Sequence, residues 1–327
     1  MERRPSTGSR ALREPARTAS ERWILRRERW PMAARKVTVI GLGAMGAGIA
    51  HRLIESSFAV TVHNRTGAKA LPLAEAGATV APCAAEAVRD ADVVLLSLGD
   101  EEAVEQVLFG DAVKGLRAGT VVVDTSTVSP AYARDAEERL AALGCPRIEA
   151  CLIGNPAMAR AGELRVLGSG ERRTFEQVGD VLSAMGAREP LYLGATGRAG
   201  AMKLAFNLIL GAQTAALGEA LALTASAGLD RELVLTAITR SGWGSPVLNF
   251  RAELMRTRGY EPAGFRARLM AKDLRLAVET AAEAGLTLPV TAEAGRRFGE
   301  VVAAGRGDAD AAVVCELDRR PAGADAG

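Results

Sequence analysis

Histidine is almost missing from this sequence, since only His51 and His63 occur among 327 residues. Acid–base catalysis by histidine and histidine-rich metal sites are therefore nearly excluded. No apolar run of 18 residues occurs, so we expect no transmembrane helix, and a net charge of +2 predicts no nucleic-acid or membrane partner. The cysteines show no C-x-x-C pair and no zinc spacing, which predicts reduced thiols in a cytoplasmic protein without a metal; they are Cys83, Cys145, Cys151 and Cys315.

The first 31 residues differ in composition from the rest of the chain. They hold nine Arg and four Glu among Ser, Thr and Pro, and only Trp23-Ile24-Leu25 interrupts them with an apolar run. Without an apolar h-region a secretory signal is not expected, and the four Glu argue against an import leader. We expect residues 1–31 to be a disordered or artefactual leader, with Met32 as the true start.

A glycine-rich turn is the most informative feature of the chain. The strand-like run Val37-Thr38-Val39-Ile40 ends in a G-x-G-x-x-G motif, which is Gly41-Leu42-Gly43-Ala44-Met45-Gly46. In such a motif the first glycine permits the turn, the second lets backbone approach phosphate, and the third lets the helix pack on the strand. A helix pattern and a second strand at 59–63 follow, so the motif predicts a dinucleotide pyrophosphate site at a helix N-terminus.

The end of the strand 59–63 indicates which dinucleotide is bound. NAD-binding proteins usually place an acid there, about 20 residues after the motif, to bind the ribose 2′-hydroxyl. This chain has Asn64-Arg65-Thr66 instead, which offers a cation and a hydroxyl to a 2′-phosphate. We therefore predict that NADP(H) is preferred and that NAD(H) can also bind; the alternative is a solvated loop arginine.

Strands and helices alternate from Lys36 to about residue 195, and this pattern predicts an α/β fold with a doubly wound parallel sheet. Beyond that point only helices are predicted, so we divide the chain into a dinucleotide-binding domain at 32–195 and an all-α domain at 196–327, with a frayed tail from about 306. The expected strands are 37–41, 59–63, 92–97, 120–124, 147–150 and 164–168, and the expected helices include 101–108, 129–143, 198–227, 230–240, 246–258, 267–285 and 289–304. Asp100 is the expected N-cap of the first of these helices.

A lysine is the expected proton donor, because hydride delivery to a carbonyl leaves an alkoxide and histidine is scarce. Lys203 lies in an otherwise apolar helix, where burial would lower its pKa toward neutrality. Asn207 follows one turn later on the same face and could orient the substrate or the lysine. The alternative for Lys203 is a side chain that extends along the helix to reach water.

Two loops follow predicted strands at the edge of the sheet where ligands bind. Ser97 and Leu98 should line the cofactor groove after the strand 92–97. Thr127 follows the strand 120–124, and the alternative is that Ser126, Thr127 or Ser129 caps the next helix.

Four spaced motifs between about residues 36 and 305 resemble the β-hydroxyacid dehydrogenase family, which includes 3-hydroxyisobutyrate dehydrogenase. They are the glycine-rich turn, the segment Glu149-Ala150-Cys151-Leu152-Ile153-Gly154-Asn155 with Ala161-Gly162-Glu163-Leu164, Gly194-x-x-Gly197 with Lys203 and Asn207, and Lys272-Asp273-Leu274-Arg275-Leu276-Ala277 with Gly285 and Pro289. The resemblance implies a Rossmann-type domain followed by a helical one, a homodimer or homotetramer, and Lys203 as the catalytic lysine.

The same resemblance implies roles for further residues. Thr127 would contact the nicotinamide side of the cofactor, and Lys272 would lie near the cofactor and the active site; a surface ion pair is the alternative for Lys272. Asp273, Trp243 and Phe265 are candidate substrate contacts, although single aromatic residues more often belong to a core.

The substrate segment departs from the family pattern Ser-Gly-Gly, which holds a substrate carboxylate. Ile153-Gly154-Asn155 stands there instead, so the hydroxyl is replaced by an apolar side chain. Pro156 removes an N–H nearby, while Asn155 could offer an amide.

The sequence thus predicts an NADP(H)-dependent oxidoreductase that acts on a small β-hydroxyacid, semialdehyde or related carbonyl. One alternative is an imine or ketone reductase without a carboxylate requirement. Another is a non-catalytic nucleotide-binding scaffold, against which the intact Lys203 and Asn207 argue.

Overall fold

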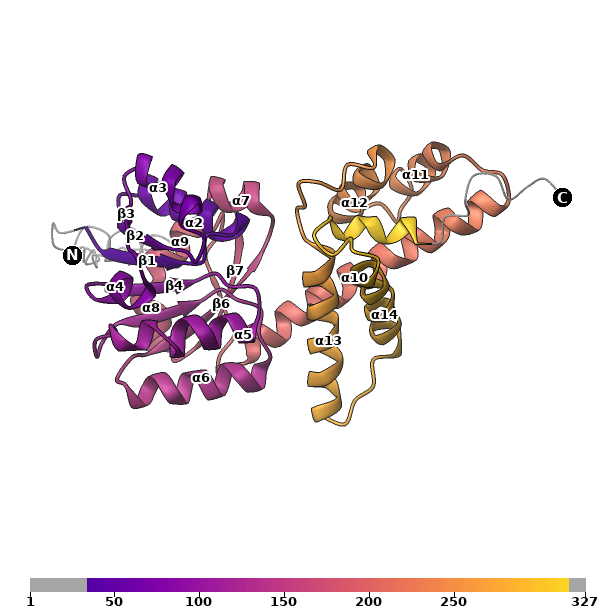
Figure 1. The fold of residues 1–327 in the computed structure, drawn as a ribbon. Coiled ribbons are helices and arrows are strands. Elements are labelled where there is room, and N and C mark those ends of the chain that lie inside the picture. Colours follow the sequence, from indigo (N-terminus) through magenta and orange to yellow (C-terminus); the bar gives the residue numbers. More distant parts are fainter. Residues whose placement is uncertain (1–33, 318–327) are drawn as a thin grey trace, which may run out of the picture. The chain divides into compact units, whose positions relative to one another are not determined.

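The structure is a computed structural model that describes residues 34–317, and the predicted leader at 1–31 lies outside the described residues. The first half of the described chain forms an eight-stranded sheet, whose strands lie in the order β3-β2-β1-β4-β5-β6-β7-β8 (Figure 1). The strands are β1 (Lys36–Ile40), β2 (Ala59–His63), β3 (Thr79–Val80), β4 (Val93–Leu96), β5 (Val121–Asp124), β6 (Arg147–Ile153), β7 (Arg165–Gly170) and β8 (Leu191–Tyr192).

The predicted doubly wound sheet is confirmed, with one exception in strand direction. Every neighbouring pair is parallel except β6 and β7, which are antiparallel over six residue pairs, from Ile148–Gly170 to Ile153–Arg165. A short connection through one small helix joins these two strands, so the chain returns beside β6 in the opposite direction. The sequence analysis missed β3 and β8, because two residues are too few to form a pattern.

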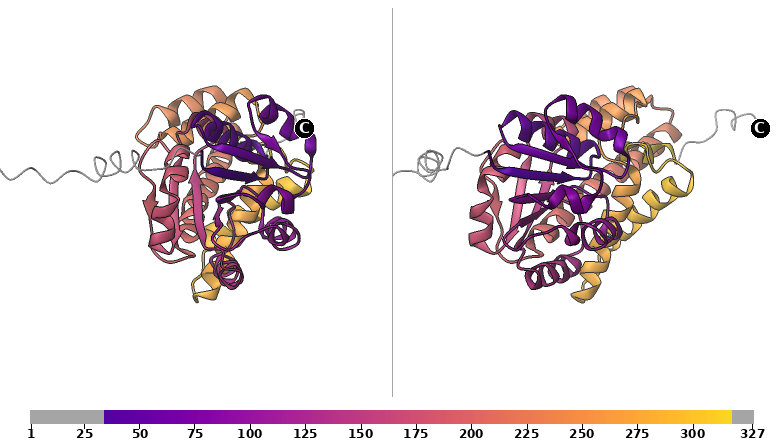
Figure 2. Two further views of the ribbon diagram at one scale, coloured as in Figure 1. Left: turned by 90° about the vertical axis from the view of Figure 1, so that its left-hand side faces the viewer. Right: turned by 60° about the vertical axis from the view of Figure 1, so that its left-hand side comes forward.

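Apolar side chains on both faces of the sheet explain why these strands form. Successive residues of a strand point to opposite faces, and Val93 and Leu95 join one apolar cluster while Val94 and Leu96 join the other. Helices cover both faces (Figures 1 and 2). They are α2 (Ala44–Glu55), α3 (Leu71–Glu75), α4 (Ala84–Val88), α5 (Glu101–Val104), α6 (Pro130–Ala142), α7 (Pro156–Ala161), α8 (Arg172–Gln177) and α9 (Gly179–Met185), with the short turns η1 (Gly67–Ala70), η2 (Glu105–Phe109) and η3 (Ala112–Lys114). Asp100 caps α5 as predicted, with its side chain 2.8 Å from the Ala103 N–H.

The second half of the described chain is helical, as predicted. Its helices begin and end within about two residues of the predicted bounds, because apolar periodicity and capping residues mark both ends. They are α10 (Arg198–Ser226), α11 (Arg231–Thr239), α12 (Pro246–Thr257), α13 (Ala267–Glu283) and α14 (Pro289–Ala303), followed by the short helix η4 (Ala311–Glu316).

The prediction of a frayed tail from about residue 306 is wrong for the part that the structure describes. Asp310 is completely buried, and residues 311–315 of η4 join the apolar core of the helical half. Asp310 forms a buried ion pair with Arg251 and accepts hydrogen bonds from the Gly264 and Phe265 N–H groups, both at 3.0 Å. A buried, paired carboxylate is a tertiary feature that local composition does not reveal.

Helix α10 is long and apolar enough to cross a membrane by length and composition alone. The prediction of no such segment considered uninterrupted apolar runs, and α10 escapes that criterion because Lys203, Asn207, Gln213 and Glu219 interrupt it. The same test is passed by core helices of soluble proteins, and α10 packs against α13, α14 and η4.

Candidate functional site

The turn between β1 and α2 is built as a close-packed glycine turn. Gly41 adopts φ +95° and donates its N–H to the His63 carbonyl at 3.0 Å. A Cβ on Gly41 would lie 2.3 Å from the Ser97 carbonyl oxygen, and one on Gly46 would lie 1.9 Å from the Gly41 carbonyl oxygen. Gly43, by contrast, has open space around the position of a Cβ. The first and third glycines are therefore required by the protein itself, and the second leaves room for a ligand.

The N-terminus of α2 is suited to an anion. Gly43 is its N-cap and supplies no side-chain hydrogen bond, and no acidic residue occupies the first turn. The first N–H groups of a helix have no partner within it and carry the positive end of the helix dipole. Gly43 and Ala44 are exposed and Met45 is half-buried, whereas Leu42 is buried. A dinucleotide pyrophosphate fits this cradle.

The loop after β2 places its three predicted residues differently. Asn64 is occupied within the protein: its Oδ1 accepts the Leu42 N–H at 2.9 Å and its Nδ2 donates to the Thr66 carbonyl at 3.0 Å. It therefore fixes the glycine turn to this loop. Arg65 and Thr66 are exposed. Their side chains are accessible to a bound molecule.

Hydrogen bonds connect the loops after β4 and β5. The Leu98 N–H donates to Ser126 Oγ at 3.1 Å, and the Ser126 N–H donates to Asp124 Oδ1 at 2.9 Å. Asp124 is held in turn by a fully buried ion pair with Arg147, at 2.8 Å. Ser129, rather than Thr127, caps α6 through the Tyr132 N–H. The capping alternative for Thr127 is thus removed.

Lys203 projects from α10 toward the end of β6. Its Nζ donates a hydrogen bond to the Leu152 carbonyl oxygen at 2.7 Å. Burial lowers the pKa of this ammonium below its ordinary value, while the nearby Asp273 and Cys151 oppose the shift and Lys272 adds to it. An amine whose pKa is lowered by burial gives up and recovers its proton more readily than an extended surface lysine.

Asn207, Asp273 and Lys272 form one polar group between α10 and α13, joined by a hydrogen bond and an ion pair. Asn207 Nδ2 donates to Asp273 Oδ2 at 2.5 Å. Lys272 Nζ donates to the Thr127 carbonyl at 2.5 Å and lies 3.0 Å from Asp273 Oδ1, as an ion pair without hydrogen-bond geometry. The alternative of a surface pair is wrong, because Asp273 is buried. Asp273 therefore orients Asn207 and Lys272.

The segment predicted to bind substrate comes directly after Leu152, whose carbonyl oxygen binds Lys203. Ile153 ends β6 and packs against a small cluster that contains Cys151 and Ala199. Gly154 is exposed, with φ +149°. Asn155 Oδ1 accepts the Met158 N–H at 3.0 Å and caps α7. The side-chain oxygen of Asn155 is thus used within the fold, while its side-chain nitrogen remains for other contacts.

Two predicted aromatic contacts do not join this group. Trp243 lies between α11 and α12 and is 86% exposed, so it forms no pocket wall within one chain. Phe265 is half-buried and packs against the core of the helical half. The structure therefore brings together the residues from β4, β5, β6, α10 and α13, and leaves Trp243 and Phe265 outside.

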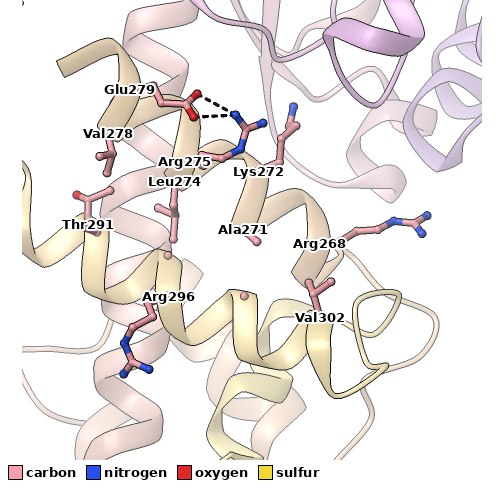
Figure 3. Close-up of a pocket in the computed structure, with 13 residues that line it drawn as sticks. Arg268, Ala271, Lys272, Leu274, Arg275, Val278, Glu279, Thr291, Arg296 and Val302 are labelled. Carbon is pink, nitrogen blue, oxygen red and sulfur yellow. Dashed lines mark hydrogen bonds and ion pairs between the residues drawn. The ribbon is translucent and has the colours of Figure 1, made fainter. Parts of the chain in front are cut away.

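A separate groove of about 670 Å³ lies between α13 and α14 (Figure 3). Apolar residues such as Leu274, Val278 and Val302 line it, and Lys272 is the one predicted site residue in its wall. Arg275 at its rim is paired with Glu279 at 2.8 Å. Within residues 34–317 no cluster of His, Cys, Asp and Glu could hold a metal ion.

The sequence analysis missed one buried polar group at the site. Glu149 was noted only as part of a motif, yet its carboxylate accepts the Gly197 N–H at 2.6 Å and is bonded to Ser169. An acidic residue in a strand that is otherwise buried was the available signal, because an ionised side chain is rarely buried without a purpose.

Comparisons with known proteins match this architecture over nearly all of the described chain. Residues 36–198 match the family described as the NAD binding domain of 6-phosphogluconate dehydrogenase, and residues 197–317 match that described as NAD-binding of NADP-dependent 3-hydroxyisobutyrate dehydrogenase. Glyoxylate/succinic semialdehyde reductase 1 of Arabidopsis thaliana is 30% identical over 283 residues, covering 86% of this chain and 97% of the relative.

Solved structures agree with these matches. The crystal structure of 3-hydroxyisobutyrate dehydrogenase from Salmonella typhimurium has a TM-score of 0.80 at 26% identity, over 86% of this chain and 99% of that one. Psf3 in complex with NADP+ and 2-OPP has a TM-score of 0.75 at 27% identity, with the same coverage. The arrangement of a glycine-turn domain and a helical domain is thus shared with proteins of known activity.

Proposed function

The chain belongs to the β-hydroxyacid dehydrogenase family of NAD(P)-dependent oxidoreductases acting on hydroxyl groups, and from that premise we propose a more specific activity. It transfers a hydride between NADP(H) and a small β-hydroxyacid, semialdehyde or related carbonyl, with Lys203 as the proton donor. The observation that carries this proposal is the buried Lys203 ammonium, hydrogen bonded at the end of β6 and lowered in pKa.

The residues of the chain have separate roles in this reaction. When bound, the reduced nicotinamide supplies the hydride. The N–H groups at the start of α2 hold the pyrophosphate, and the space beside Gly43 lets it approach. Lys203 donates a proton to the oxygen that becomes an alkoxide, and its charge stabilises that oxygen beforehand. Asn207, held by Asp273, orients the lysine or the substrate.

Preference for NADP(H) rests on the exposed residues after β2. Arg65 presents a planar guanidinium and Thr66 a hydroxyl, and neither is a carboxylate that would repel a 2′-phosphate. Asn64 supports this contact indirectly, because it fixes the loop to the glycine turn.

We also propose a homodimer or homotetramer, as in the family that the sequence resembles. An apolar row on α10, formed by Met202, Phe206 and Ile209, is 40%, 46% and 53% exposed. Their spacing of four and three residues places them on one side of the helix. A second copy would remove this row from water.

A second candidate function follows from the β6–α7 loop. Ile153 offers an apolar side chain, Asn155 Oδ1 is committed to capping α7, and Pro156 has no N–H. This loop suits a ketone or imine that carries no carboxylate, because a buried carboxylate needs several donors.

The deciding experiment measures NADPH and NADH oxidation with a panel of small carbonyls, each as the free acid and as its methyl ester. Turnover of an acid with NADPH supports the first proposal, and turnover of the esters alone supports the second. Cofactor binding without turnover on the whole panel would leave a nucleotide-binding scaffold as the function.

A further inference from the structure

One face of β6 carries two buried charged residues, which is unusual for a strand inside a buried sheet. Ile148, Ala150 and Leu152 point into an apolar cluster of the sheet. Arg147 and Glu149 alternate with them and therefore point to the other face, although both are buried. Arg147 forms an ion pair with Asp124 and also interacts electrostatically with Glu149, but Glu149 forms no salt bridge among residues 34–317.

The Glu149 carboxylate lies at the first turn of α10. Its Oε2 accepts the N–H of Gly197, the N-cap residue, at 2.6 Å. Ser169, which is directly opposite Glu149 on β7, donates to the same carboxylate and accepts the Ala199 N–H at 3.2 Å. Gly197 has no side chain with which to cap the helix itself, so β6 and β7 supply the cap from outside.

The second carboxylate oxygen has no hydrogen-bond partner among the described residues. Oε1 of Glu149 lies 3.1 Å from the position of a Cβ on Gly200, in the first turn of α10. An unpaired buried carboxylate oxygen is costly and needs an explanation. The positive end of a 29-residue helix provides one, because it stabilises a negative charge at this position.

We propose that Glu149 is a positioning residue for Lys203, an inference that rests on the proposed function. Glu149 holds the first turn of α10 against β6, and three residues farther along β6 the Leu152 carbonyl accepts a hydrogen bond from the Lys203 ammonium. Two attachments to one strand fix both the position of the helix and the direction of the lysine. Without the first, α10 can shift along β6 and the ammonium leaves its place.

The test compares Glu149→Ala and Glu149→Gln with Asp230→Ala. Asp230 is the matched control, because it caps α11 through the Glu232 and Leu233 N–H groups and lies outside the site. Glu149→Ala should lower kcat by roughly 10²-fold, the effect of misplacing a reacting group by about 1 Å. Glu149→Gln keeps an acceptor for the Gly197 N–H and should lower kcat only about tenfold.

Three further readouts separate positioning from general stability. NADPH affinity should stay within about twofold, because the glycine turn lies between β1 and α2, away from Glu149. The primary isotope effect with deuterated NADPH should rise in both Glu149 variants as the chemical step slows. Asp230→Ala should lower Tm and leave kcat and the isotope effect unchanged. If kcat per folded enzyme is unchanged in both Glu149 variants, the proposal is overturned.

Chemical labelling tests the same idea without catalysis. Reductive methylation of Lys203 in the protein without cofactor, followed by mass spectrometry, should be several-fold faster in Glu149→Gln than in wild type or Asp230→Ala. Equal labelling rates would overturn the positioning role. A wild type that turns over no carbonyl would refute the proposed function, and the labelling comparison would still decide whether Glu149 positions the lysine.

Discussion

Replacement of Lys203 by alanine tests the proposed chemistry most directly. The variant removes the ammonium that donates to the Leu152 carbonyl, and leaves the glycine turn between β1 and α2 untouched. Loss of a positioned acid and of its charge beside the alkoxide should lower kcat by roughly 10²–10³-fold, or about 3–4 kcal/mol in the barrier. NADPH affinity should be nearly unchanged. Asn207→Ala should lower kcat less, about tenfold, because its amide orients a neighbour.

The rates of reduction and oxidation should change with pH in opposite directions. Reduction needs the protonated amine, so its kcat should fall as the pH rises through the pKa of Lys203. Oxidation of the alcohol needs the neutral amine, so its kcat should rise through the same pKa. Burial places that pKa below the ordinary value of about 10.4. The titratable groups around Lys203 are Asp273 and Lys272 on α13, together with the Cys151 thiol on β6, and Asp273→Asn should move both limbs to lower pH.

The assay measures steady-state rates in both directions across pH for the wild type and Lys203→Ala. A matched control is Lys114→Ala, which removes an exposed lysine of η3 and should change neither rate nor profile. Near-normal turnover in Lys203→Ala, or a pH limb that survives the substitution, would show that another group or a water supplies the proton. The catalytic assignment would then be wrong even though the family is established.

Four other substitutions probe the cofactor site and the core. Arg65→Ala should weaken NADPH binding about tenfold and leave NADH binding unchanged in calorimetry, because this exposed contact is worth only about 1.5 kcal/mol; equal affinities of the wild type for both cofactors would contradict the NADP(H) preference. Gly43→Ala should lower cofactor affinity at unchanged Tm, whereas Gly46→Ala should lower Tm, since its Cβ would lie 1.9 Å from a carbonyl oxygen; identical behaviour of the two variants would refute the separate roles. Asp310→Ala should lower the free energy of unfolding in urea by about 3–5 kcal/mol, because it leaves Arg251 buried and unpaired; a loss under 1 kcal/mol would show that the pair contributes little.

Features set by local sequence could be predicted, and features set by distant partners could not. The turn at Gly41–Gly46 and the cap at Asp100 depend on residues within a few positions, so their patterns are visible in the sequence. The antiparallel direction of β7 and the burial of Asp310 depend on where the chain returns after a loop. The residues next to β7 or Asp310 in the sequence do not show where the chain returns after a loop.

In the candidate site, too, some residues could be predicted from local spacing, whereas their tertiary contacts could not. Lys203 and Asn207 could be paired from their spacing, because residues four apart share a helix face. The partner of Lys203 is a backbone carbonyl, which any residue at position 152 would supply, so no side-chain pattern could reveal it. Asn64 and Asp273 were expected to contact ligands, but both are occupied by protein groups, which only tertiary contacts can show.

The distribution of buried charge argues for catalysis rather than for nucleotide binding alone. Asp273 is buried, burial lowers the pKa of the neighbouring Lys203 ammonium, and Glu149 is buried three residues from the carbonyl that Lys203 binds. Buried ionised groups seldom add stability, and apolar residues of similar volume would pack as well or better. A scaffold would gain nothing from keeping them. An enzyme would, because a desolvated ammonium with a lowered pKa and fixed direction is what a developing alkoxide requires.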